Sequence, residues 1–261
     1  MKLAAIGSNC IDYYDNLNEG YPGGGPVNMA VYTVRLGGEA SYIGPVGNDE
    51  FGDVMRKTIK EKGVDTSHIH VKEGKTALTH VSLIDGERIF GDYDEGVLEQ
   101  YTLSDDDISF ILTHDIVVCD LWGKVECFFQ KLQESGIPTA FDGHNRPTDK
   151  ESMCAMPFTD YFFFSSDDGD TEELRAQMKK FHAKGPTLVV AMLGELGSLC
   201  FDGKNFTSYG IAKCDVVDSM GAGDSYIAGF LYSLKQGKNI EECMHAGAVN
   251  AGVTLGYKGA W

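Results

Sequence analysis

Short apolar runs alternate with amphipathic segments along most of the chain. The runs, each long enough for one strand, lie at 3–7, 40–44, 116–119, 139–142, 161–164 and 188–193. Between them, apolar residues recur every three to four positions, which predicts helices over 27–36, 51–62, 125–134 and 172–183. Strands that alternate with helices form a parallel sheet with helices on both faces. The pattern therefore predicts an α/β fold in which two helical layers enclose a mostly parallel central sheet.

Two stretches, near 12–21 and 76–93, break this alternation. Both are extended in character, and the second contains the turn signal Asp85-Gly86. They predict a small sheet outside the main layer, either as a lid over a cleft or as a hairpin without a function. Because no repeat or linker divides the chain, we expect a single domain over 1–261 that carries these lid segments.

Composition narrows the class of protein. The chain has 261 residues, of which 43% are hydrophobic, and no apolar run reaches the ~18–20 residues of a membrane span. The apolar start is too short for a signal peptide, so we expect a cytoplasmic protein. Seven cysteines without Cys-x-x-Cys spacing argue against a disulfide framework or a zinc site. A net charge of -17 repels nucleic acids and anionic membranes, which are excluded as partners.

The most informative segment is VVDSMGAGDSYIAGF at 216–230. Gly221, Ala222 and Gly223 precede a helix with an apolar stripe, so the unpaired amides of the helix start converge on an anion. Asp224 follows directly, and it either caps this helix or accepts the proton of a hydroxyl that attacks a bound phosphate. We favour the second role within the run Asp-Ser-Met-Gly-Ala-Gly-Asp, because a carboxylate beside an anion hole is placed to accept that proton. Each such amide contributes on the order of 3 kcal/mol to stabilising a transferring phosphoryl group.

A second glycine-rich segment, PGGGPVNMA at 22–30, lies in the N-terminal half. Gly24 and Gly25 allow a ligand to approach the backbone closely. Asn28 offers a donor and an acceptor to a pair of sugar hydroxyls, or else bonds its own helix start. Asp12, taken alone, is an ordinary acid at the end of a strand.

Together these segments resemble the two signatures of the ribokinase-like (PfkB-type) carbohydrate kinases, in the family's order. The second signature is Asp-Thr-x-Gly-Ala-Gly-Asp, from which this chain departs only at Ser219. The resemblance covers nearly the whole chain. It implies a ribokinase-like three-layer sandwich with a small β lid, a sugar and ATP as substrates, and Asp224 as the catalytic base. The residues that it implies at the anion hole are Gly221, Ala222 and Gly223, and those at the sugar are Asp12, Gly24, Gly25, Asn28 and the lid residue Arg88.

The resemblance extends to the nucleotide and metal sites. Gly194 and Gly197 match a turn that lies along ATP, and Asn250 is the polar candidate on the last helix, with a solvent-facing role as its alternative. Asp168 stands where relatives carry the glutamate that organises Mg²⁺, although Ser165 replaces their asparagine. The family also leaves open a monovalent cation beside the anion hole and a homodimer.

Within the family, the short lid and the overall sequence look most like kinases that phosphorylate fructoselysine on a primary hydroxyl. The acidic composition suits the ammonium group of such a substrate. A kinase for ribose, fructose or a nucleoside is the alternative, and a sugar-binding protein without catalysis is a third. A dinucleotide-binding protein is disfavoured because no Gly-x-Gly-x-x-Gly follows the first strand.

Overall fold

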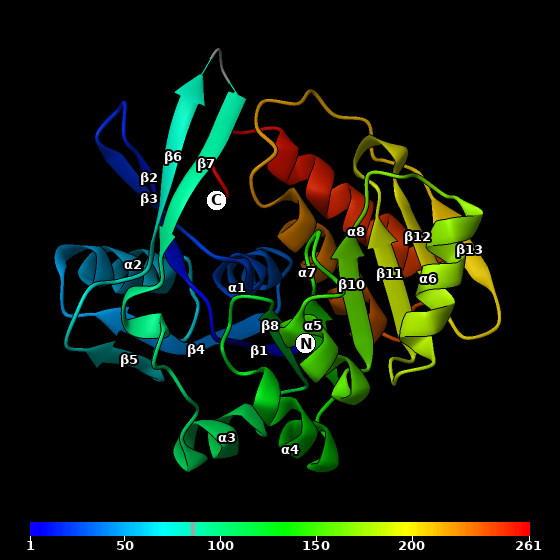
Figure 1. Cartoon of the computed structure of the whole chain (residues 1–261), viewed down its shortest axis with the longest axis horizontal. Helices are drawn as coiled ribbons and strands as arrows, with labels where there is room; N and C mark the ends of the chain where they lie inside the picture. Colours follow the sequence, from blue (N-terminus) through cyan, green and yellow to red (C-terminus); the bar gives the residue numbers. More distant parts are fainter. Residues whose placement is uncertain (85–86) are drawn as a thin grey trace.

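A nine-stranded sheet forms the centre of the molecule. The structure is a computed structural model of the chain that describes residues 1–84 and 87–261, without the side chains of 83–90. Within these ranges the strand order is β13-β12-β11-β10-β9-β8-β1-β4-β5 (Figure 1). The strands are β1 (Lys2–Ile6), β4 (Glu39–Gly47), β5 (Ile69–Lys72), β8 (Ile116–Asp120), β9 (Thr139–Asp142), β10 (Tyr161–Ser165), β11 (Leu188–Met192), β12 (Ser198–Phe201) and β13 (Phe206–Tyr209). All neighbours from β11 to β5 are parallel, and β12 and β13 add an antiparallel edge.

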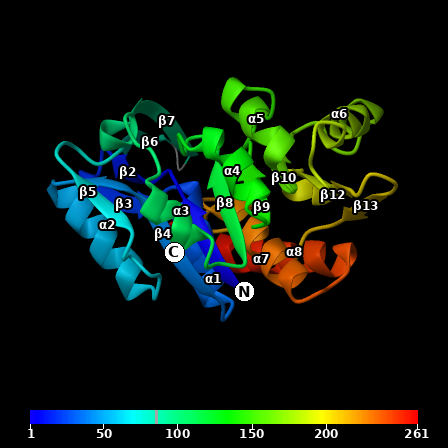
Figure 2. The same ribbon diagram turned by 90° about the horizontal axis from the view of Figure 1, so that it is seen from below.

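Helices cover both faces of this sheet, which confirms the predicted three layers (Figure 2). One layer contains α1 (Gly25–Arg35), α2 (Glu50–Glu61), α7 (Ala222–Lys235) and α8 (Ile240–Leu255). The other contains α3 (Asp105–Ile111), α4 (Phe129–Glu134), α5 (Lys150–Ala155) and α6 (Glu172–His182). Short 3-10 turns lie at η1 (Gly96–Leu98), η2 (Glu126–Phe128), η3 (Met156–Phe158) and η4 (Gly194–Leu196).

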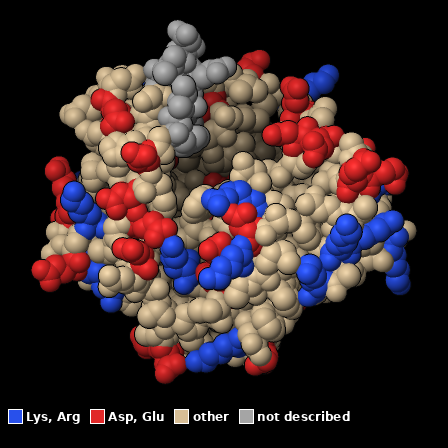
Figure 3. Space-filling model, viewed as in Figure 1, with Lys and Arg blue, Asp and Glu red and all other residues tan. Residues whose placement is uncertain are grey.

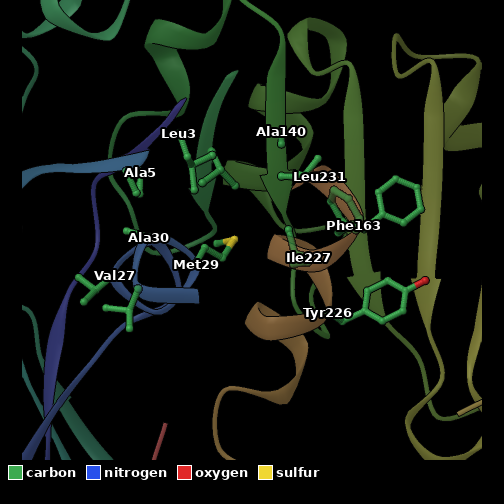
Figure 4. Close-up of a cluster of buried hydrophobic side chains, with 14 of the residues drawn as sticks. Leu3, Ala5, Val27, Met29, Ala30, Ala140, Phe163, Tyr226, Ile227 and Leu231 are labelled. Carbon is green, nitrogen blue, oxygen red and sulfur yellow. The ribbon is translucent and has the colours of Figure 1, made fainter. Parts of the chain in front are cut away.

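Alternating side chains of the central strands fill two separate cores. In β1, Leu3 and Ala5 pack into the core beneath α1 and α7, while Ala4 and Ile6 pack into the opposite core. A strand that is buried on both faces must be apolar at every position, which is why β1 is a continuous apolar run. Figure 4 shows the first of these cores, where Met29 of α1 and Ile227 of α7 lie under the sheet.

The helix starts follow from capping side chains. Asp49 caps α2 and accepts a hydrogen bond from the Gly52 amide at 2.9 Å. Asn239 and Glu242 form a capping box at the start of α8. The predicted helix over 125–134 is partly wrong, because its first turn is the 3-10 turn η2 and α4 begins only at Phe129.

The two extended stretches form the predicted small sheet, with the order β3-β2-β6-β7. Its strands are β2 (Cys10–Tyr14), β3 (Glu19–Gly23), β6 (Leu78–Ile84) and β7 (Glu87–Asp94). The chain passes from β1 into β2 and returns through β3 into α1, so this sheet stands directly beside the ends of the main strands (Figure 1). Within the described ranges, no helix is both long enough and apolar enough to cross a bilayer.

Candidate active site

A cleft of about 1150 Å³ opens between the small sheet, the carboxyl ends of the parallel strands and the start of α7. Ligands of open α/β sheets bind at this edge, where loops from several strands converge. Figure 3 shows the hollow on this face, with acidic side chains around it. The structure brings eight of the predicted site residues into its lining: Asp12, Gly24, Gly25, Asn28, Gly221, Ala222, Gly223 and Asp224.

The glycine loop ends at the first turn of α7. Gly221 has φ 72°, in the left-handed region, and a Cβ there would lie 2.2 Å from the hydroxyl of Tyr32. A glycine is therefore required on both conformational and steric grounds. Beyond it, the amides of the first turn of α7 lie at the cleft, and they share the positive end of the helix dipole. This geometry fits an anion such as a phosphate.

Asp224 is tied to a different helix rather than to its own. The cap position of α7 is Gly221, while a carboxylate oxygen of Asp224, Oδ2, accepts a hydrogen bond from Asn28 Nδ2 at 2.8 Å. Burial raises the pKa of Asp224 to about 7, although the positive charge of His144 and the bond from Asn28 act in the opposite direction. A carboxyl group that titrates near neutral pH suits a general base better than a helix cap.

Asn28 is less available to a sugar than the sequence predicted. Its Oδ1 accepts a hydrogen bond from the indole Nε1 of Trp261 at 2.7 Å, and its Nδ2 already donates to Asp224. Only 5% of Asn28 is exposed. One N–H of the amide remains to face a ligand, so the expected donor and acceptor pair is not presented.

Three further residues lie at the base of the cleft that sequence reasoning did not assign: Asp120, Asp142 and His144. The Nε2 atom of His144 lies 3.5 Å from Asp120, and its Nδ1 lies 3.7 Å from Asp142. Burial disfavours a charged ring, but the two carboxylates outweigh it and raise the pKa of His144 to about 10. The signal that could have revealed them is position, since the two aspartates end the adjacent strands β8 and β9.

Gly25 lies between the carboxylates of Asp120 and Asp224. A Cβ at this position would lie 2.7 Å from Asp120 Oδ2 and 3.3 Å from Asp224 Oδ1. Asp120 is held by Ser8, whose hydroxyl donates to it at 2.7 Å, and by the Trp122 amide. The acids therefore point into one common space beside the backbone of Gly25.

The small sheet contributes Asp12, which is 7% exposed and lies in β2. The thiol of Cys10 lies 3.5 Å from its carboxylate, and both residues line the cleft with Thr79 and Tyr93. Tyr93 and Trp122 form an edge-to-face pair with ring centroids 5.8 Å apart, which joins the small sheet to the loop after β8. Arg88 belongs to β7, but its side chain lies outside the described part of the structure.

The predicted nucleotide contact of Asn250 has no support in the structure. Asn250 is 4% exposed, its Nδ2 donates to the Ser225 carbonyl at 2.7 Å, and its Oδ1 accepts from Arg35 at 2.7 Å. Both ends of the amide are thus committed to contacts inside the protein. Val249 and Val253 on the same helix are 43% and 53% exposed.

The other nucleotide and metal candidates lie apart from the described lining of the cleft. Gly194 is exposed and has open space where a Cβ would be, whereas a Cβ at Gly197 would lie 2.1 Å from the Tyr209 carbonyl oxygen. Gly197 therefore has a structural reason to be glycine. Asp168 is exposed on the turn after β10, and only Ser165 of that turn lines the cleft.

Similarity to known proteins decides the class of this site. The pattern of the pfkB family carbohydrate kinases matches residues 5–157 and 158–261. The chain belongs to the pfkB family of carbohydrate kinases. The chain is therefore an ATP-dependent carbohydrate kinase, as the motifs predicted.

Curated relatives are similar over their whole length. The chain is 40% identical over 259 residues to the fructoselysine 6-kinase of Escherichia coli (strain K12), covering 99% of each protein. It is 32% identical to a fructosamine kinase of Bacillus subtilis (strain 168), covering 100% of this chain and 93% of the relative.

Solved structures share the fold of this pfkB-family kinase. The ribokinase of Arabidopsis thaliana complexed with ribose and ATP superposes with a TM-score of 0.84 at 21% identity, covering 99% and 93% of the two chains. The fructokinase of Xylella fastidiosa with bound ATP gives 0.81 at 22% identity, with the same coverage. At this identity the likeness confirms the ribokinase-like fold alone.

Proposed function

We propose that the enzyme transfers the γ-phosphoryl group of ATP to the 6-hydroxyl of fructoselysine. The observation that carries this proposal is the 40% identity to fructoselysine 6-kinase over 99% of both chains. Fructokinases are less similar, at 28% identity over 82% of this chain for that of Salmonella typhimurium. A plain sugar kinase is therefore the second candidate.

Asp224 is the base in this proposal, and its Oδ1 receives the proton of the attacking hydroxyl. The new bond forms between the sugar oxygen and the γ-phosphorus, while the bond from that phosphorus to the β-phosphate oxygen breaks and releases ADP. The amides at Gly221, Ala222 and Gly223 hold the transferring group. Oδ1 is suited to the proton transfer because Oδ2 is occupied by Asn28 and Oδ1 lies next to Gly25 at the cleft.

The charges of the cleft support a cationic substrate. Among the described residues, the charged lining of the cleft contains five acids against one lysine and one histidine, namely Asp12, Asp120, Asp142, Asp218, Asp224, Lys258 and His144. Fructoselysine carries an ammonium group next to its sugar, and a neutral sugar does not. Carboxylates that are fixed by Ser8 and by backbone amides attract such a cation without needing to reorganise.

ATP arrives with Mg²⁺ in this proposal, and Asp168 remains the candidate protein ligand. No group of three or more His, Cys, Asp or Glu side chains in the described ranges could hold a metal ion alone. Mg²⁺ in kinases keeps waters and binds one or two carboxylates together with the phosphates, so an exposed acid three residues after the lining residue Ser165 fits it. The ion would neutralise the charge of the phosphates. A requirement for a monovalent cation, the Arg88 contact, the turn at Gly194, a homodimer and a cytoplasmic location remain predictions.

A substrate panel tests the proposal. ADP release would be measured at matched concentrations of fructoselysine, fructose, ribose and adenosine, and Asp224→Asn would serve as the blank for contaminating kinases. We expect kcat/KM for fructoselysine to exceed that for fructose by 100-fold or more, as about 3 kcal/mol from a charged contact would give. Equal values for fructose and fructoselysine would overturn the substrate assignment. Phosphate transfer to none of the four would favour a sugar-binding protein.

A further inference from the structure

The last five residues of the sequence, 257–261, form a strap between α1 and the glycine loop, and Lys258 within this strap lines the cleft. The carbonyl of Ala260 accepts hydrogen bonds from the hydroxyls of Tyr32, at 2.5 Å, and Tyr257, at 3.0 Å. The Gly259 amide donates at 2.7 Å to Asp218, whose other oxygen accepts from the Met220 amide in the glycine loop. The strap thereby connects α1 to the loop that leads into α7.

Trp261 is the last residue of this strap, and it contacts Asn28, which in turn contacts the proposed base Asp224. Its indole Nε1 donates to Asn28 Oδ1 at 2.7 Å, and Asn28 Nδ2 donates to Asp224 Oδ2 at 2.8 Å. An indole N–H can only donate, so the amide must present its oxygen to Trp261. Its nitrogen then necessarily faces Asp224. The chemistry of the indole thus selects one of the two orientations that an amide can adopt.

We propose that Trp261 is a positioning residue for phosphoryl transfer, because its N–H locks the Asn28 amide and leaves Asp224 Oδ1 directed at the substrate hydroxyl. The inference rests on the proposed role of Asp224 as the base. Without the indole N–H, the amide is free to rotate by a half turn and to place Oδ1 against the carboxylate. Two facing acceptors repel each other, which displaces Asp224 and favours its protonated form.

Other charged and titratable groups around Asp224 set the background for this effect. His144, Asp142 and Asp120 act on it from the ends of β8 and β9, and Asp224 in turn raises the pKa of Tyr32 in α1. None of these groups touches the indole through a described hydrogen bond. A change at Trp261 therefore reaches Asp224 through the Asn28 amide, and its effect on the pH profile is separable from theirs.

The test is Trp261→Phe, which removes the donor and keeps an aromatic ring. We expect kcat to fall about three- to tenfold, as the loss of one hydrogen bond would give, with the KM for ATP unchanged. In the pH profile of kcat, the decline on the acid side should also move to higher pH. Lys62→Ala is the matched control: its ammonium lies 5.5 Å from the indole centroid, so the variant changes the surroundings of the ring but not its N–H. It should leave kcat and the pH profile as in the wild type.

A second replacement keeps the test decisive if Trp261→Phe does not fold. 3-Benzothienylalanine at position 261 has the fused rings of tryptophan with sulfur in place of the N–H, so it conserves packing. It should show the same loss in kcat and the same shift of the decline on the acid side. In an Asn28→Ala background, Trp261→Phe should cause no further loss, since both changes break one chain of contacts. A wild-type kcat and pH profile in the folded benzothienyl variant would overturn the inference.

A different result would contradict the proposed role of Asp224 as the base. If Asp224→Asn retained wild-type turnover, the assignment of the base would be wrong, whatever Trp261 does. If Asp224→Asn were inactive and both changes at 261 were silent, the base would stand and only the positioning role would fall.

Discussion

The two ends of the cleft are built in opposite ways. At the sugar end, the carboxylates of Asp120 and Asp224 are each held by hydrogen bonds from other elements. On the side of the glycine loop, where we propose that ATP binds, Val216 and Val217 line the cleft and are 68% and 62% exposed, and Val249 of α8 is 43% exposed.

This difference separates catalysis from nucleotide affinity. Preorganised polar groups stabilise a transition state because they need not reorient as charge develops. Apolar walls instead favour the flat face of a base through burial and impose little directional chemistry. Substitutions at the sugar end should therefore change turnover and sugar use, and those at the valines should change only the KM for ATP.

The largest effect is expected for Asp224→Asn. The amide cannot accept the proton of the hydroxyl, so kcat should fall by ~10²-fold or more while the fold is retained. Turnover would be measured by ADP release and folding by thermal denaturation. Asp106→Asn, an exposed carboxylate in the first turn of α3, is the control and should keep kcat. Near-wild-type turnover in Asp224→Asn would show that Asp224 is not the base.

Asp12→Ala should change sugar binding and not nucleotide binding. The loss of a charged hydrogen-bonding group should raise the KM for the sugar about 10- to 100-fold, with the KM for ATP unchanged. Asp15→Ala, at the exposed end of the same segment, should leave both constants as they are. An increase confined to the KM for ATP would reverse our division of the cleft.

Asn250→Ala tests whether the side chain of Asn250 in α8 stabilises the fold or binds ATP. The variant leaves the Ser225 carbonyl and one Arg35 contact unpaired, so the free energy of unfolding should fall by about 2 kcal/mol. The KM for ATP should stay within about twofold. Val249→Ser, one residue earlier and exposed, should do the reverse, with a KM for ATP raised about threefold and little change in stability. The opposite pattern would restore Asn250 as a nucleotide ligand.

The smallest effect expected is a shift of pH dependence in His144→Gln. Asp224 must be ionised to act, so kcat/KM should decline as the pH falls below about 7. The positive charge of His144 lowers the pKa of Asp224. Its removal should move the acid limb to higher pH, which a profile between pH 5 and 9 would measure. A limb that moved to lower pH would show that His144 acts on the base in another way.

The free energy of unfolding should also depend on the protonation of Asp224. The folded-state pKa of Asp224 lies above that of the unfolded chain, so its contribution to stability is present at low pH and is lost as the pH rises through about 7.

The sequence predicted those parts of the molecule that local backbone chemistry determines. The glycine loop that ends at Asp224 and the small sheet follow from turn residues, a helix start and extended stretches, each of which lies within a short segment of the sequence. The internal contacts of Asn250 could not be predicted because its partner Arg35 comes from α1, which is distant in sequence. Asp120 and His144 were missed because they meet only where β8 and β9 lie side by side.

Trp261 was missed for the same reason. Its position at the end of the sequence gave no sign that its indole would reach Asn28, 233 residues earlier. Contacts of that range depend on how α1 and the strap pack, and no local pattern encodes them.

Gly25 limits how this site can change over generations. Every other amino acid has a Cβ, and that atom would lie 2.7 Å from one carboxylate and 3.3 Å from another. Since no coding change that replaces this glycine avoids adding that carbon, position 25 offers no gradual route to a new residue. We therefore expect a change of substrate to come from substitutions at the surrounding side chains, with Gly25 kept between the two acids.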